Sequence, residues 1–171
     1  MSEIPKWFER KFDFSFPVEL YSNLRVRIAG TPARLEELLR QISQEQLLRK
    51  LGGTWSIQEN AGHLLDLEPL WLARVEDFLA AVETLTAADL TNQKSHQANH
   101  NARPVGEILV EFRAARVNLV KRLERLPPAL FARTALHPRL KTPMRLVDHM
   151  YFVAEHDDHH LARIWEIGAM K

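Results

Sequence analysis

Apolar residues recur at intervals of three and four along most of the chain, which is the spacing of amphipathic helices. Alternating runs of apolar and polar residues are nearly absent, and no Asn-Gly or Asp-Gly turn joins two apolar runs. The pattern therefore predicts an all-α fold. The length of 171 residues suits one domain, which we place at residues 1–171.

The first helical stretch runs from about Pro17 to Ile28 and meets a break at Gly30-Thr31-Pro32. In this tripeptide Thr31 is a candidate N-cap and Pro32 suits the first helical position. Beyond the break one apolar face continues as Leu35, Leu38, Leu39 and Ile42. The pattern leaves open whether this region is one kinked helix or two helices in sequence.

The second long helix, predicted at about 56–82, has the clearest start in the chain. Ser56 and Glu59 have the spacing of a capping box, in which each side chain accepts a hydrogen bond from the other residue's backbone. Pro69 lies inside this helix and removes one backbone hydrogen bond, so we expect a kink or a break there. Residues 84–103 are polar and lack an apolar stripe, which predicts a long connection.

A third helix is predicted from about Pro104 to Pro127, and a fourth over about 143–168. The basic residues of the third helix lie off its apolar stripe, so we expect them on a solvent-exposed face: Arg113, Arg116 and Arg122. Four long helices with one long connection among them predict a four-helix bundle with a crossover.

Composition and charge exclude several classes of protein. The chain has 46% apolar and 26% charged residues, as ordinary globular domains do, and its 23 basic residues balance its 22 acidic ones. This balance gives no indication of a nucleic-acid or membrane partner. The chain shows no secretion signal and no apolar run of the roughly 18 residues that a membrane span needs, so we expect a cytoplasmic protein. It contains no cysteine, which excludes disulfides, thiolate metal ligands and a cysteine nucleophile.

Two histidines in the last helix are the strongest chemical signal. His156 and His160 are spaced i, i+4 and fall on the apolar stripe that contains Val153 and Ile164, so we expect them to point inward. Two imidazoles within an apolar stripe are costly to bury unless their nitrogens are bonded, and a shared metal ion would satisfy both.

A catalytic metal usually has about three protein ligands, so a third must come from another helix. His63 is the best candidate, because it lies on an otherwise apolar face within the first turns of the capped second helix. The alternative is that each of the three is a core histidine bonded to a neighbouring group, in a bundle without a metal.

The remaining histidines are interpreted differently. His96 and His100 also have i, i+4 spacing but lie in the stripe-less polar segment, so we assign them to a solvated loop. His159 is about 100° from His160 around the helix, which suits a surface or hydrogen-bonding position. His149 is interpreted as a core histidine.

Asp66, three residues after His63, has two interpretations of equal weight. It is either a functional carboxylate, which fixes the imidazole tautomer or acts as a general base near a metal-bound water, or an ordinary carboxylate on the helix surface. The tryptophans are expected to serve in packing: Trp55, Trp71 and Trp165.

Two motifs together resemble a known family. The first is Trp55-Ser56-x-x-Glu59-x-x-x-His63-Leu-x-Asp66-x-Glu68, and about 90 residues later comes His156-x-x-His159-His160-Leu-Ala-x-Ile164. In this order and spacing they resemble the DinB-like superfamily, and in particular its YfiT-like metal-dependent hydrolases. The match spans most of the chain.

The resemblance implies a four-helix bundle that holds one divalent ion, often nickel or zinc, on His63, His156 and His160. It also implies homodimers. Family members with assigned activity include transferases and isomerases that use low-molecular-weight thiols such as bacillithiol or mycothiol. Two departures from the family pattern are Pro69 and Arg163, the latter at a position where many relatives carry glutamine.

Two functions are therefore compared. The first is an enzyme, either a metal-dependent hydrolase or a thiol-dependent S-transferase, which activates water or a thiolate against a small-molecule substrate, with Asp66 as the candidate for proton transfer. The second is a non-catalytic metal- or thiol-binding stress protein in which the ion ties two helices together. A fourth protein ligand would favour the structural ion, whereas an open position beside a cavity would favour catalysis.

Overall fold

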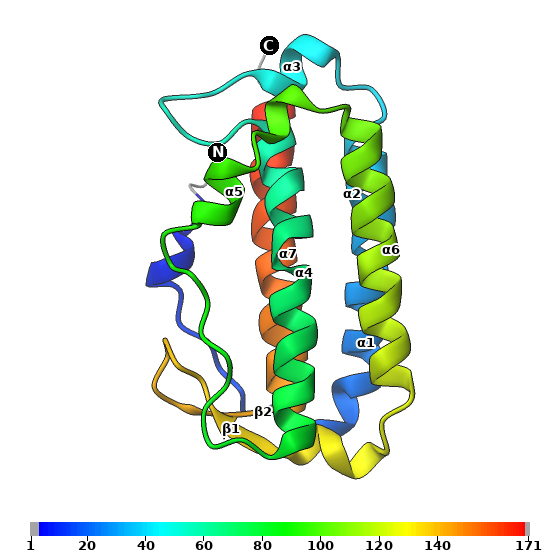
Figure 1. Cartoon of the computed structure of the whole chain (residues 1–171), viewed down its shortest axis with the longest axis vertical. Coiled ribbons are helices and arrows are strands. Elements are labelled where there is room, and N and C mark those ends of the chain that lie inside the picture. Colours follow the sequence, from blue (N-terminus) through cyan, green and yellow to red (C-terminus); the bar gives the residue numbers. More distant parts are fainter. Residues whose placement is uncertain (1–3, 170–171) are drawn as a thin grey trace.

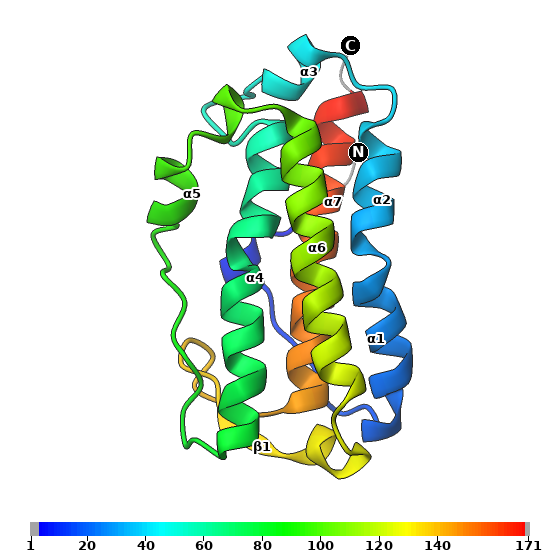
Figure 2. The same ribbon diagram turned by 45° about the vertical axis from the view of Figure 1, so that its right-hand side comes forward.

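The computed structural model describes residues 4–169, so residues 1–3 and 170–171 of the predicted domain lie outside the described residues. Four helical columns form the body of the molecule (Figures 1 and 2). The first column consists of two consecutive helices stacked end to end. The helices of the four columns are α1 (Tyr21–Ala29) with α2 (Thr31–Leu39), α4 (Ile57–Ala80), α6 (Val105–Glu124) and α7 (Leu146–Ala169).

The columns close into a four-helix bundle, as the sequence predicts. Helix α4 packs against both α6 and α7, and the α1–α2 column also packs against both of them. The colours of Figure 1 show that α4 and α6 run in the same direction while the α1–α2 column and α7 run in the opposite one. The parallel pair requires a crossover, which residues 81–104 make along the outside of α4.

Short elements decorate the ends and the outer face of the bundle. They are η1 (Trp7–Glu9), η2 (Val18–Leu20), α3 (Gln44–Leu48), α5 (Gln93–Gln97), η3 (His100–Ala102) and η4 (Pro128–Ala132), where η denotes a 3₁₀ helix. Because α5 and η3 lie within the crossover, that connection is partly helical rather than unstructured.

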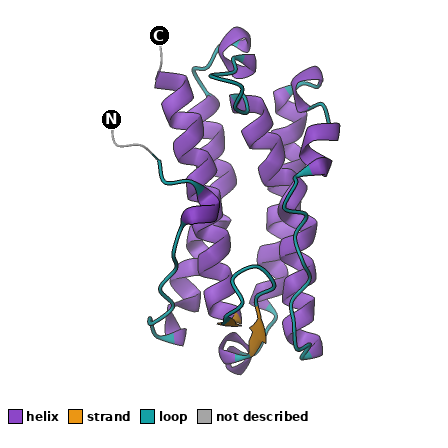
Figure 3. Ribbon diagram, turned by 90° about the vertical axis from the view of Figure 1, so that its left-hand side faces the viewer, coloured by secondary structure: helices purple, strands orange, loops and turns teal. Residues whose placement is uncertain are grey.

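A small antiparallel sheet at one end of the bundle was not expected from the sequence (Figure 3). Strand β1 (Thr134–Leu136) pairs with β2 (Pro143–Arg145), with Ala135 opposite Met144 and both side chains buried. Three-residue strands are too short to show alternation in the sequence. The last helix therefore begins at Leu146, three residues later than predicted.

The capping box of α4 is confirmed. The Glu59 backbone N–H donates to Ser56 Oγ at 3.1 Å, and the Ser56 N–H donates to Glu59 Oε2 at 2.8 Å. Of the kink or break expected at Pro69, the break is wrong, because α4 continues from Ile57 to Ala80 with Pro69 on its exposed side. Thr31 does not cap α2, since its hydroxyl donates instead to Asp157 Oδ2 at 2.7 Å.

The bundle core consists of two apolar clusters separated by a polar layer. On α4, for example, Ile57 and Leu64 belong to one cluster, while Val75 and Phe78 belong to the other. Each column contributes one polar residue to the layer between them, and all four are buried: Thr31, Glu68, Arg116 and Asp157. We call these four residues the arginine layer.

The expectation that the basic residues of the third helix are all exposed is therefore wrong for Arg116, which is 1% exposed. It is correct for Arg113 and Arg122, which pair with Glu36 and Glu76 at the surface. Within the described residues, no helix is long and apolar enough to cross a membrane.

Candidate metal centre

The structure brings together the three histidines selected from the sequence. His63 lies in the second turn of α4, and His156 and His160 lie one turn apart on the adjacent α7. One ring nitrogen from each residue lies within 4.8 Å of the other two, and all three side chains are buried. Among the described residues, no fourth histidine, cysteine or carboxylate belongs to this group, which we call the histidine cluster.

The cluster does not point at the bundle axis, although the sequence predicted inward-facing side chains. At this level the axis is filled by Asp157 and Arg116 of the arginine layer. The three histidines instead line a cavity of about 520 Å³ on the outer face of α4 and α7. The N-terminal segment, the loop before α4, the crossover and the β1–β2 loop supply other parts of its wall.

A hydrogen-bond chain fixes the orientation of His63. Ser95 Oγ lies 2.9 Å from His63 Nδ1 and 2.7 Å from Asp66 Oδ2. The single hydroxyl proton of Ser95 is donated to the Asp66 carboxylate, so Ser95 Oγ accepts a hydrogen bond from His63 Nδ1–H. This tautomer leaves the lone pair of His63 on Nε2, the nitrogen with no hydrogen-bond partner in the described part of the chain.

An amide fixes His160 in the same way. Asn60 Nδ2 donates to the Ser56 carbonyl at 2.8 Å, and its Oδ1 lies 2.8 Å from His160 Nδ1. An amide oxygen only accepts, so His160 carries its proton on Nδ1 and keeps a lone pair on Nε2. Two of the three rings are thus held in the tautomer that a metal ligand of this kind requires.

His156 lacks hydrogen-bond partners of this kind. Its Nδ1 is buried without a hydrogen-bond partner, and the ring is packed edge-on against Trp7 and Trp71 at centroid distances of 5.0 and 5.5 Å. Ordinary core histidines have their nitrogens satisfied by protein groups. At each ring of the cluster at least one nitrogen has no such partner among residues 4–169, as is also true of the core residue His149. What distinguishes the cluster is that one nitrogen of each ring lies within 4.8 Å of the other two, and this convergence fits a shared ion.

Burial keeps the cluster neutral. It lowers the pKa of His63 to about 4, against a smaller opposing effect of Asp66, and the neighbouring histidines lower it further. Burial and the adjacent imidazoles also hold the pKa values of His156 and His160 well below the usual range. Near pH 7 all three rings are therefore neutral imidazoles, which is the form that binds metal.

Asp66 is linked to the cluster by hydrogen bonds through Ser95. It is buried, which excludes the surface-carboxylate interpretation, and it accepts hydrogen bonds from Ser95 and from His100 Nε2 at 2.8 Å. Burial raises the pKa of Asp66, but these hydrogen bonds outweigh that effect and hold the pKa below its usual value. Among the described residues it does not line the cavity of the histidine cluster, so the geometry favours positioning of His63 over proton transfer to a substrate.

The assignment of His100 to a solvated loop is wrong. His100 is 2% exposed and its ring packs against Gly62 of α4, where an added Cβ would lie 2.2 Å from the imidazole. The absence of a side chain at Gly62 therefore creates the space that His100 fills. His96 is exposed as expected, although its ring lies 5.6 Å from that of Trp55.

Other aromatic residues also differ from expectation. His159 is half-buried and lines the cavity beside His160, with ring centroids 5.2 Å apart, and burial lowers its pKa to about 4. Trp71 packs in the core as predicted and, with Trp55, also lines the cavity, whereas Trp165 is 66% exposed and does not pack as predicted. The core position of His149 is confirmed.

Comparisons with known proteins agree with this architecture. The model of the DinB superfamily matches residues 27–164. One solved structure, YfiT from Bacillus subtilis, is described as a probable metal-dependent hydrolase with an unusual four-helix bundle topology. The two chains are 20% identical and superimpose with a TM-score of 0.81, over 93% of this chain and 91% of YfiT. No curated protein sequence matches this chain. The family model covers most of the chain and both motifs that carry the histidine cluster, and the chain belongs to the DinB superfamily.

Proposed function

We propose that this protein holds one divalent metal ion on His63, His156 and His160 and acts as a metal-dependent hydrolase on a small molecule. The observation that supports this most directly is the convergence of three imidazoles, each with a nitrogen lacking a protein partner, at the wall of a cavity. At 20% identity the likeness to YfiT carries the fold alone, so the proposal depends on this donor set.

The chemistry of the donors selects the kind of ion. Three neutral imidazoles suit zinc or nickel, whereas calcium and magnesium prefer oxygen ligands. When bound, such an ion supplies a Lewis acid that makes water or a thiol nucleophilic near neutral pH.

An open position supports catalysis over a structural role. Structural zinc sites are usually closed by four protein ligands, whereas catalytic sites use three and leave a position for a reactant. The histidine cluster has three donors among the described residues and borders a cavity of about 520 Å³. The alternative of a non-catalytic stress protein with a structural ion is therefore the weaker one.

The protein's own residues prepare the site in two ways. Ser95, held by Asp66, and Asn60 keep the Nε2 lone pairs of His63 and His160 directed into the cavity. The rings of Trp55 and Trp71 pack beside the rings of His63 and His156, at centroid distances of 4.6 and 5.5 Å, and help to fix their positions. In this proposal Asp66 is a positioning residue.

Thiol-dependent S-transfer is the second candidate reaction. The cavity is larger than a water nucleophile needs and leaves room for an organic thiol beside a substrate. The chain has no cysteine, so a thiol nucleophile would come from a low-molecular-weight cofactor. Homodimer formation, implied by the family resemblance, is also a proposal, and light scattering of the purified protein in solution tests it.

Metal analysis of tag-free protein, purified without chelators, tests the site. We expect about one zinc or nickel ion per chain in the wild type, almost none in His160→Ala, and a wild-type content in the matched control His96→Ala. Wild-type protein without stoichiometric metal, even after incubation with zinc or nickel and gel filtration, would refute the proposal.

Turnover tests the reaction. We expect the metal-loaded protein to hydrolyse members of a panel of small esters and amides, or to join a supplied thiol to an electrophile, with loss of either activity in folded His63→Ala. Product formation that requires the thiol would identify S-transfer. Turnover that is equal in the metal-loaded and the metal-free protein would contradict both reactions.

A further inference from the structure

The cavity that contains the histidine cluster has a second polar end, formed by Arg74 of α4 and Arg139 of the β1–β2 loop. Arg74 is 1% exposed; its Nε donates to the Thr86 carbonyl at 2.9 Å, and its Nη1 lies 3.3 Å from His137 Nε2. Within residues 4–169, the Arg139 side chain makes no hydrogen bond or ion pair, and its Nη2 is buried. In the described part of the chain, neither guanidinium has a carboxylate bound to it.

This arrangement differs from that of the other deeply buried arginine. Arg116, equally buried, donates to the carboxylates of both Glu68 and Asp157. The carboxylate that acts on Arg74 is that of Asp77, which already accepts the Thr86 N–H at 2.6 Å. Buried positive charge without a partner is unfavourable, so an anion from outside the chain would stabilise this end of the cavity.

Both arginines nevertheless stay charged near pH 7. Burial lowers the pKa of Arg74 to about 10, and it also lowers the pKa of Arg139. His137, between them, is neutral, because burial and the two arginines lower its pKa to about 3. Two charged guanidiniums thus belong to this end of the cavity, while the carboxylate of Asp89, also in its wall, accepts the N–H groups of Thr91 and Gln93.

Aromatic rings hold Arg139 in place. Its guanidinium carbon lies 5.3 Å from the ring centre of Phe8, 5.7 Å from that of Phe152 and 6.0 Å from that of Trp7. Contacts of this kind engage the face of the planar group and leave its N–H edge available. A guanidinium held in this way is suited to paired hydrogen bonds with carboxylate or phosphate oxygens.

The two polar ends of the cavity are well separated. His63 and Arg74 lie eleven residues apart on the continuous helix α4, which places their backbones about 16 Å apart along its axis at 1.5 Å per residue. The cavity wall between them is apolar and includes Leu67, Leu70 and Trp71. The cavity therefore offers a metal-ligand end, an apolar middle and a cationic end.

We propose that Arg74 and Arg139 bind the carboxylate or phosphate group of an elongated small molecule whose apolar body lies along α4 and whose reactive group reaches the histidine cluster. The placement of the reactive group rests on the proposed function. Binding of the anionic group does not, because neither arginine is one of the proposed metal ligands, although the charge of Arg139 acts on His156.

Binding of three matched probes to the metal-free protein tests this proposal: 6-phenylhexanoate, 6-phenylhexyl phosphate and the neutral 6-phenylhexan-1-ol. Calorimetry should show that at least one anion binds about tenfold or more tightly than the alcohol, as expected for hydrogen bonds to a charged group. The tighter of the two anions identifies the group as carboxylate or phosphate.

Substitution of the arginines locates the binding. Arg139→Gln should remove most of the preference for the anion, whereas Arg163→Gln, which removes a guanidinium from the wall near the histidine cluster, should retain it. Equal affinity for anion and alcohol, or a preference that survives Arg139→Gln, would overturn the proposal. So would a preference that is lost only in Arg163→Gln.

Two controls separate the possible failures. Thermal unfolding of Arg139→Gln should show a cooperative transition close to that of the wild type, because the loss of the aromatic contacts is offset by removal of a partly buried charge. Its metal content should equal that of the wild type. If Arg139→Gln loses the preference for the anion but keeps the wild-type metal content, the loss is due to the arginine and not to a damaged metal site. If the wild-type protein binds no metal, the proposed function is refuted, but the anion-binding result still holds.

Discussion

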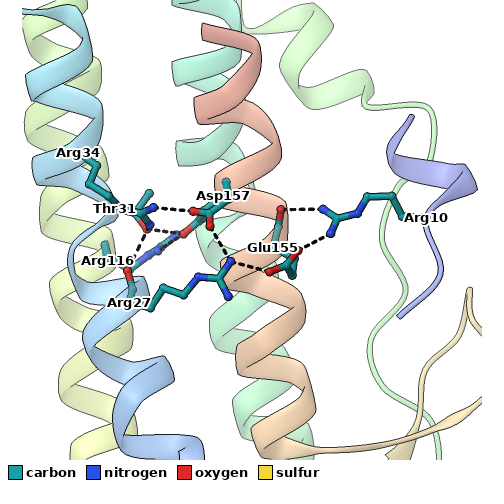
Figure 4. A network of polar contacts seen from close by, with 8 residues as sticks. Arg10, Arg27, Thr31, Arg34, Arg116, Glu155 and Asp157 are labelled. Atoms are coloured by element: carbon teal, nitrogen blue, oxygen red, sulfur yellow. Dashed lines mark hydrogen bonds and ion pairs between the residues drawn. The ribbon is translucent and has the colours of Figure 1, made fainter. Parts of the chain in front are cut away.

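The arginine layer and the histidine cluster lie at the same level of the molecule, and consecutive residues of α7 belong to them. Asp157 faces the bundle axis and bonds to Arg116 and Thr31 (Figure 4), whereas His156 faces the cavity beside α4. Arg116 meets two carboxylates and the Ile28 carbonyl, so its charge is neutralised within the chain. The nitrogens directed into the cavity have no such partner among the described residues.

The difference distinguishes two uses of buried polar groups. The arginine layer joins all four columns, and on the outer side of α7 Glu155 extends the contacts to Arg10 and Arg27 (Figure 4). Groups that satisfy one another in this way fix the packing of helices. The imidazoles of the histidine cluster instead each keep a ring nitrogen without a protein partner, and this arrangement suits a ligand from outside the chain.

Removal of Arg116 should have the largest effect on stability. Arg116→Met leaves Glu68 and Asp157 buried without their cation, which should lower the free energy of unfolding by about 3–5 kcal/mol. Urea denaturation measures this change. The matched control Arg113→Met breaks an exposed pair with Glu36 and should cost about 1 kcal/mol or less.

A second variant distinguishes lost charge pairing from lost packing. Combining Arg116→Met with Glu68→Gln and Asp157→Asn removes the uncompensated charges and should recover a substantial part of the stability. An Arg116→Met protein as stable as the wild type would show that the arginine layer is not a structural element.

The pH dependence of stability should be the next largest effect. In the metal-free protein the pKa values are about 4 for His63 and about 3 for His137, below the value of about 6.5 in an unfolded chain. At pH values between the folded-state and unfolded-state pKa values, the unfolded state binds more protons than the folded state does. The free energy of unfolding therefore falls as the pH falls below about 6.5. Each of the two buried histidines should contribute a loss of about 2 kcal/mol between pH 6.5 and pH 5.

His137→Asn isolates one of these contributions. The amide oxygen can still accept the backbone N–H groups of Arg139 and Leu140, which His137 Nδ1 accepts in the wild type, but it does not titrate. Urea denaturation at a series of pH values should show a shallower slope for the variant. Identical slopes in both proteins would contradict the proposed burial of a neutral His137.

The smallest effect should come from the hydrogen bond behind His63. Ser95→Ala removes the acceptor of the Nδ1 proton and releases the tautomer, which should weaken zinc binding about 10- to 100-fold without unfolding the protein. Competition with a chromophoric chelator measures this affinity. The control His96→Ala, at the next residue and on the exposed side of α5, should bind zinc as the wild type does. An unchanged affinity of Ser95→Ala would show that the hydrogen-bond chain does not act on the metal.

The sequence predicted the helices because their signals are local. Apolar periodicity located four columns, and the Ser56–Glu59 box located the start of α4 to within a residue. The same periodicity placed His156 and His160 on one side of α7, and the structure brings His63 to them.

The errors concern contacts between distant segments. Arg116 lies on the buried face of α6, between Phe112 and Leu119, and its charge can be buried there because Glu68 and Asp157 of other helices pair with it. His100 is buried because Gly62 leaves space for its ring, and Ser95 reaches His63 only through the path of the crossover. No local pattern encodes these pairings, since they depend on how the columns and the crossover pack in three dimensions.

X-ray absorption spectroscopy of the zinc-loaded protein tests the central claim most directly, because it counts the imidazole ligands of the ion. We expect three imidazole nitrogens at about 2.0–2.1 Å in the wild type, with the remaining coordination completed by light atoms. Folded His156→Ala should show fewer imidazoles or no bound zinc. A wild-type spectrum with fewer than three imidazoles, or one left unchanged by His156→Ala, would contradict a metal centre built from His63, His156 and His160.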